Sequence, residues 1–190
     1  DFEGQDCWIG ADMSERDDMT AVVLVFRRAG ALVWFPQFWL PQDVIRRRVR
    51  EMSMDFYKVW TESGVVTATE GDWIDTEGIE AHIREACERF KVRSIVFDRY
   101  GTGPDIVTRL ERDGHPAGIL NYTAGNIGSA ALDLEARVRA ALAHCDTGDP
   151  ARWSILHDFH CGGFARVSDA LREFIAAFES QFFQCLHTIR

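Results

Sequence analysis

Two aspartates, each at the end of an apolar stretch, are the residues best suited to chemistry. Asp12 follows the apolar segment 7–11, and Asp98 closes the apolar segment 92–97. In α/β sheets ligands bind at the carboxyl ends of strands, so neighbouring strands can bring two such side chains together. Two carboxylates held close together stay ionised only with a cation between them, and such oxygen ligands suit Mg²⁺ or Mn²⁺. On spacing alone, the alternative that each aspartate only makes a strand-end turn or caps a helix stays open.

The hydrophobic pattern predicts the elements that would position these aspartates. An antiparallel meander of three strands is expected over 7–12, 20–26 and 31–38, where β-branched and aromatic residues are dense. Further along, strands are expected at 65–69, 92–98 and 117–121, and helices at 41–54, 75–90, 102–113, 129–144 and 167–186. Strands that alternate with helices after an antiparallel start predict an α/β fold, a mixed sheet flanked by helices on both faces.

Composition limits the class of protein. The 190 residues are 46% hydrophobic, which suits one domain over 1–190, and carry a net charge of −9. This charge repels nucleic acid at long range, so contact with DNA would need a local basic patch or a bound metal. Lys58 and Lys91 are the only lysines among 21 basic residues, and arginine favours forked contacts to phosphate or carboxylate.

Cellular location is predicted from three absences in the sequence. The five cysteines form no CxxC pair, which indicates reduced thiols, and the acidic start has no signal-peptide character. No apolar run reaches the ~20 residues that a membrane span needs. We therefore expect a cytoplasmic protein with no membrane partner.

Several motifs in order resemble the nuclease domain of phage terminase large subunits. The opening is carried by Ile9-Gly10-Ala11-Asp12-Met13-Ser14 and Asp18-Met19-Thr20-Ala21, a G-x-D-x-S strand end followed by a D-x-T-A strand. The similar segments that follow are 35–41, 57–60, 64–67, 71–75 and 95–100, and then His144 with Gly148-Asp149-Pro150 and Trp153. The likeness covers residues 7–157, whereas 158–190 is divergent and expected to be helical. It implies a ribonuclease H-like fold.

The resemblance also implies a function. Members of the family are metal-dependent endonucleases that cut concatemeric double-stranded phage DNA during genome packaging. Asp12 and Asp98 match the first two acidic ligands, and Asp169 stands where the third is expected. Asp158 and Asp18 are alternatives, because the stretch before Asp169 is short and lacks the family's lysine. Two Mg²⁺ or Mn²⁺ ions would then be the cofactors, one lowering the pKa of a water and the other stabilising the departing 3′ oxygen.

Arginines are the candidate DNA contacts. Arg99 beside Asp98 would orient the scissile phosphate or pair with a carboxylate, and Arg46 and Arg47 in an arginine-rich helix would bind backbone phosphates. The alternative for this helix is a solvated face whose arginines pair with Asp43 and Glu51. Because phosphate contacts carry no base information, we expect low sequence specificity.

Other partners and rival functions complete the predictions. The family implies a terminase ATPase domain, a small terminase subunit and a portal protein as partners, in an infected bacterial host. No GxxxxGK[ST] loop occurs, so no ATP site is predicted. His144, Cys145, His157, His160 and Cys161 lack the paired spacing of a zinc site. The rivals are a junction resolvase or exonuclease with the same acidic cluster, and a catalytically degenerate docking module.

Overall fold

The computed structural model describes residues 2–14, 17–29, 31–52, 56–99 and 101–120. Within these ranges a six-stranded sheet has the order β4-β3-β2-β1-β5-β6. The strands are β1 (Asp6–Asp12), β2 (Thr20–Arg28), β3 (Ala31–Pro41), β4 (Val66–Thr69), β5 (Lys91–Phe97) and β6 (Ala117–Ile119). The helices are α1 (Gln42–Met52), α2 (Phe56–Glu62), α3 (Thr76–Arg89) and α4 (Gly103–Arg112).

The sheet is mixed, as the sequence predicts. Strands β1, β2 and β3 form the expected antiparallel meander, and β5 and β6 continue the sheet in parallel with β1. On the other edge, β4 pairs in parallel with β3. All of the strands except β2 therefore run in the same direction. Their carboxyl ends lie together along one edge of the sheet, perpendicular to the strands, and β2 begins at this edge.

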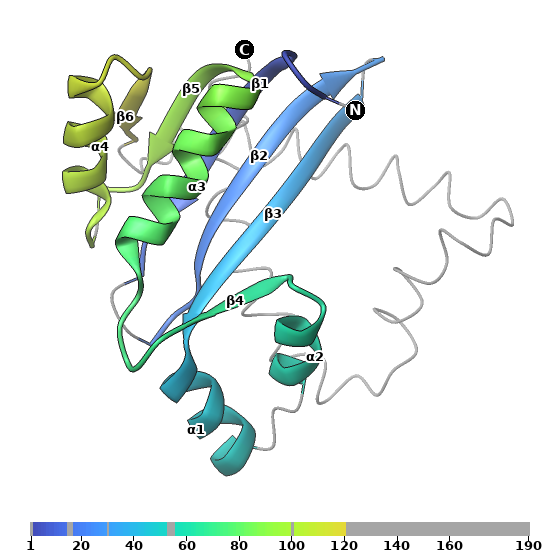
Figure 1. Cartoon of the computed structure of the whole chain (residues 1–190), viewed down its shortest axis with the longest axis vertical. Coiled ribbons are helices and arrows are strands. Elements are labelled where there is room, and N and C mark those ends of the chain that lie inside the picture. Colours follow the sequence, from blue (N-terminus) through green and yellow to red (C-terminus); the bar gives the residue numbers. More distant parts are fainter. Residues whose placement is uncertain (1, 15–16, 30, 53–55, 100, 121–190) are drawn as a thin grey trace, which may run out of the picture.

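Helices cover both faces of the sheet (Figure 1). On one face, α3 and α4 pack on alternate residues of the strands, such as Ile9 and Ala11 of β1 and Phe97 of β5, all fully buried. On the opposite face, α1 and α2 bury a second cluster that includes Phe38 of β3 and Tyr57 of α2. The alternation of side chains along a strand assigns each residue to one of these faces.

Local sequence signals explain where α3 begins and how it is tied to α4. The carboxylate of Asp75 caps α3 by accepting a hydrogen bond from the Gly78 amide at 3.0 Å. Along α3, Glu80 accepts hydrogen bonds from Arg84, one turn later, and from Arg109 of α4, each at 2.7 Å. This carboxylate therefore links the two helices that cover one face of the sheet.

The boundaries differ from the sequence prediction around residues 38–62. The chain stays extended to Pro41, rather than to residue 38, because Phe38–Pro41 pair with β4. The helix predicted over 41–54 spans Gln42–Met52, and a separate helix, α2, follows where the sequence analysis found only a motif. The helices predicted at 129–144 and 167–186 lie outside the described residues.

Two further predictions can be compared with the structure. Among the described cysteines, Cys7 and Cys87 are both free thiols, and Cys7 is fully buried. In the described part of the chain, no helix is long and apolar enough to cross a membrane.

Candidate metal centre

The parallel pairing of β1 with β5 brings the two aspartates together. Ala11 of β1 is the register partner of Phe97 of β5, so Asp12 and Asp98 follow at the same level of neighbouring strands. The amide of Asp98 donates to the carbonyl of Ala11 at 3.4 Å, which continues the ladder to this level. Because neighbouring strands lie about 4.8 Å apart and register partners share a face, Asp12 and Asp98 stand next to each other at positions that belong to one face of the sheet.

That face is the one that α1 and α2 cover. Asp12 is the register partner of Ala21 in β2, which in turn pairs with Phe38 in β3. Ala21 and Phe38 are fully buried in the cluster under α1 and α2. The row of side chains across the sheet thus runs from Asp98 (5% exposed) through the half-buried Asp12 into this apolar cluster.

The connection from β1 to β2 is held next to Asp12. The hydroxyl of Thr20 accepts a hydrogen bond from the Ser14 amide at 2.8 Å, which closes the loop at its base. Farther out, Arg48 of α1 donates to the carbonyl of Asp17 at 2.6 Å, and Arg47 forms an ion pair with the Asp17 carboxylate. Helix α1 therefore fixes the loop that follows the first candidate ligand.

Arg48 is a site residue that the sequence analysis missed. It is buried, it hydrogen-bonds to the hydroxyl of Tyr57, and its guanidinium lies 5.3 Å from the centre of that ring. The spacing contained a signal, because Arg48 is four residues after Val44 and three after Ile45, both buried. Residues at these separations share one face of a helix, so Arg48 belongs to the inner face of α1.

Helix α4 begins close to the second candidate ligand. A Cβ atom at Gly103 would lie 3.2 Å from the backbone oxygen of Asp98 and 3.4 Å from the Phe97 ring. Glycine therefore allows the first turn of α4 to approach the end of β5. Because a helix N-terminus carries a partial positive charge, this approach favours negative charge at the end of the strand.

The donor set agrees with a hard divalent ion. Asp12 and Asp98 offer carboxylate oxygens, which Mg²⁺ and Mn²⁺ prefer, and these ions keep several positions for water and phosphate oxygens. Among the residues that the structure describes, no group of three or more His, Cys, Asp or Glu residues is arranged to hold a metal. Asp169 and Asp158 lie outside the described residues, and Asp18 is exposed in the β1–β2 connection.

The predicted DNA contacts occupy different surroundings. Arg99 is exposed directly after the buried Asp98. On α1, Arg46 pairs with Asp43 at 3.3 Å, as the solvated-face alternative predicts, and both side chains are more than half exposed. Arg47 instead pairs with Asp17 of the β1–β2 connection.

Comparison with known proteins decides the family. The model of the terminase large subunit endonuclease domain matches residues 1–116, more than half of the chain. The chain belongs to this family. The terminase nuclease domain described here is 35% identical to the terminase large subunit of Enterobacteria phage HK97 over 95 residues, which is 49% of this chain and 18% of that protein.

One further relative agrees in sequence, and a solved structure agrees in fold. Protein YmfN of Escherichia coli K12 is 26% identical over 163 residues, which cover 81% of this chain and 35% of YmfN. The crystal structure of the HK97 large terminase aligns with a TM-score of 0.60 and 27% identity, over 72% of this chain and 29% of that one. The mixed sheet is thus consistent with the expected ribonuclease H-like fold. The chain spans about a third or less of the length of these relatives.

Proposed function

We propose that this domain is a metal-dependent endodeoxyribonuclease that cuts concatemeric double-stranded DNA during phage genome packaging, in the cytoplasm of the infected bacterium. The observation that supports this activity best is the level placement of Asp12 and Asp98 on neighbouring parallel strands. A nuclease that cuts phosphodiesters needs charge compensation where negative charge develops, and two adjacent carboxylates are suited to gather divalent cations there.

Each residue of the centre has a distinct role in the proposal. Asp12 and Asp98 hold two Mg²⁺ or Mn²⁺ ions, and Asp169 supplies the third carboxylate. When bound, such ions activate water and stabilise the departing oxygen of a phosphodiester. The backbone position of Asp12 is fixed from both sides, because β1 is paired with β2 and β5. No protein nucleophile is required.

The proposed substrate contacts are to the DNA backbone. Arg99, beside Asp98, orients the phosphate that is cut, and Arg46 contacts a phosphate farther along the duplex. Arg47 is a third candidate contact, and, like Arg46, it would exchange an exposed carboxylate partner for a phosphate. In the packaging machine, an ATPase domain, a small terminase subunit and a portal protein would present the DNA to this centre.

Cleavage of a supercoiled plasmid tests the proposal. With Mn²⁺ the full chain should nick and linearise the plasmid, whereas Asp12→Asn and Asp98→Asn should each abolish cleavage. Asp113→Asn is the matched control, because Asp113 ends α4 and pairs with Arg84, so its variant should cut like the parent chain. Loss of cleavage in Asp169→Asn would identify Asp169 as the third ligand.

Three outcomes would replace the proposal. A preference for branched over linear duplex DNA would indicate a junction resolvase, and degradation only from DNA ends would indicate an exonuclease. Absence of cleavage over a full range of metals and salt concentrations would contradict an enzymatic role and favour a docking module.

A further inference from the structure

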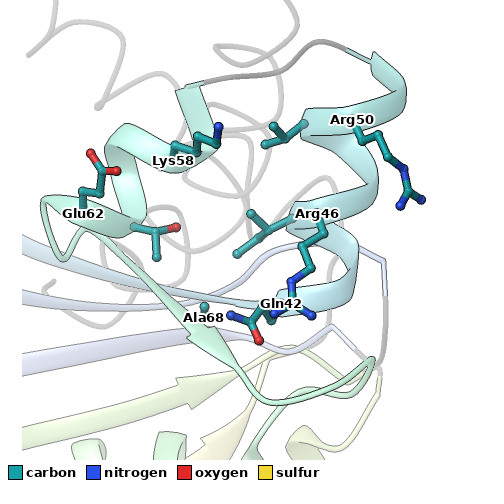
Figure 2. Close-up of a pocket in the computed structure, with 9 residues that line it drawn as sticks. Gln42, Arg46, Arg50, Lys58, Glu62 and Ala68 are labelled. Atoms are coloured by element: carbon teal, nitrogen blue, oxygen red, sulfur yellow. The ribbon is translucent and has the colours of Figure 1, made fainter.

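A groove of about 460 Å³ lies between α1 and α2, above β4. Its apolar part is formed by Ile45 and Val49 of α1 and Ala68 of β4. Figure 2 shows the polar residues at its rim: Lys58 of α2 points towards α1, Arg46 lies along α1 towards Gln42, and Arg50 points outward. The groove is thus an open channel with a cationic rim.

Among the described residues that line the groove, cations outnumber carboxylates, although the whole chain carries −9. The cations are Arg46, Arg50 and Lys58, and the carboxylate is that of Glu62. Arg46 and Arg50 form ion pairs with carboxylates on α1 itself, but these side chains are 64% and 76% exposed. Exposed pairs of this kind contribute little net free energy, so an arriving phosphate can take the place of the carboxylate.

Arg47 and Arg48 of the same helix contact the β1–β2 connection instead. Arg48 is buried against Tyr57 and the Asp17 carbonyl, and Arg47 pairs with the Asp17 carboxylate. Arg46 and Arg50, four residues apart, share the side of α1 that lines the groove. The arginine-rich stretch therefore divides into one set that holds the β1–β2 connection and one set that is presented at the groove.

The groove lies on the same face of the sheet as the acidic pair. The row that starts at Asp12 crosses Ala21 and Phe38 and reaches Val66 of β4, all on one face of the sheet. Ala68, two residues after Val66 and therefore on the same face, lines the groove. A duplex that lies along this face would meet both the acidic pair and the groove.

We propose that the α1–α2 groove binds the phosphate backbone of duplex DNA through Arg46, Arg50 and Lys58, on the same face of the sheet as Asp12 and Asp98. This inference rests on the proposed nuclease function and adds a second anchoring site to it. The site would hold the duplex in register with the carboxylates through charge, without reading its bases.

Salt-dependent DNA binding tests the proposal separately from cleavage. The full chain in EDTA is titrated against a fluorescent linear duplex at several KCl concentrations, and the variant Arg46→Gln/Arg50→Gln/Lys58→Gln is compared with it. Each phosphate contact contributes about 0.9 to the slope of log K against log salt, so losing three should reduce the slope by about 2–3. In plasmid cleavage the same variant should raise KM and leave kcat unchanged.

A matched control removes three exposed cations from the opposite edge of the sheet, where α3 and α4 end and β5 begins. This variant, Arg89→Gln/Arg93→Gln/Arg112→Gln, changes the net charge equally and should keep the parent slope. Glu62→Gln should tighten binding, because it removes a carboxylate that lines the groove.

Three outcomes would overturn the proposal. Equal loss of slope in both triple variants would mean that only net charge matters. If the groove variant binds DNA like the parent chain, the groove does not bind DNA, and an acidic protein segment becomes the candidate ligand. If the parent chain still cuts the plasmid in that case, the nuclease function stands without this site. A parent chain that neither binds nor cuts DNA would end both proposals.

Discussion

Replacing Asp98 with asparagine should stabilise the metal-free protein. Asp98→Asn keeps the shape of the side chain but removes a charge that is 5% exposed and lies beside Asp12. At the spacing of neighbouring strands, about 4.8 Å, two like charges repel each other by about 3 kcal/mol at an effective dielectric constant of about 20. Since Asp12 is partly exposed, we expect about 2 kcal/mol of this to appear as added stability. For a chain of this length, that raises the Tm by about 4–8 °C.

With a divalent metal bound, the parent chain should instead be more stable than Asp98→Asn. At a Mn²⁺ concentration of about one hundred times Kd, a bound ion stabilises the native state by about 2.7 kcal/mol. The parent chain should gain this stability, whereas Asp98→Asn, with one ligand removed, should gain little. Thermal unfolding followed by circular dichroism, in EDTA and in excess Mn²⁺, measures both effects.

The control is again Asp113→Asn. Arg84 and Arg112 hold the pKa of the Asp113 carboxyl below its usual range, so that removing this charge should lower stability in EDTA and leave the response to Mn²⁺ unchanged. The reasoning is refuted if Asp98→Asn is less stable than the parent chain in EDTA and both respond equally to Mn²⁺. That result would mean that the Asp98 carboxylate serves the fold and not a cation.

Other changes have equally definite expected results. Burial alone would raise the pKa of the Glu80 carboxyl, but hydrogen bonds from two arginines outweigh it and hold the pKa below its ordinary 4.5. Glu80→Gln should therefore lose about 1–3 kcal/mol of unfolding free energy above pH 4.5. This difference should vanish as the pH falls through the lowered pKa, which urea titrations at several pH values measure. Gly103→Ala should push α4 away from the Asp98 carbonyl, lowering the Tm and the cleavage rate together. Burial raises the pKa of Cys7 to about 12, so mass spectrometry should find this thiol unmodified by iodoacetamide until the chain unfolds. Arg48→Met should cost about 1–3 kcal/mol in chemical denaturation, because it leaves the buried Tyr57 hydroxyl and the partly buried Asp17 carbonyl without this donor.

The sheet and its acidic edge could be predicted because their signals are local. Continuous β-branched runs identify the central strands, and an aspartate at the end of two of them indicates a ligand site at one edge. The register that sets Asp12 level with Asp98 could not be predicted, since it arises from contacts between β1 and β5, about 85 residues apart in the chain. Family resemblance, and not spacing, was what favoured the functional interpretation of these two residues.

The region of α1 and α2 was harder to predict because tertiary contacts decide it. Pairing with β4 keeps Phe38–Pro41 extended, although Pro41 by itself suits the first turn of a helix. The arginine-rich stretch also did not indicate which arginines contact the β1–β2 connection and which line the groove. Arg48 is buried only because Tyr57 and Asp17 lie where they can accept its hydrogen bonds, and both belong to other segments of the chain.

Anomalous scattering from a crystal of the full chain soaked in Mn²⁺ tests the central claim most directly. We expect manganese density within about 2.2 Å of carboxylate oxygens from both Asp12 and Asp98. A third carboxylate in the same density would identify the remaining ligand. Manganese that binds elsewhere, or none at this edge of the sheet at millimolar concentration, would contradict a metal-dependent nuclease centre on β1 and β5.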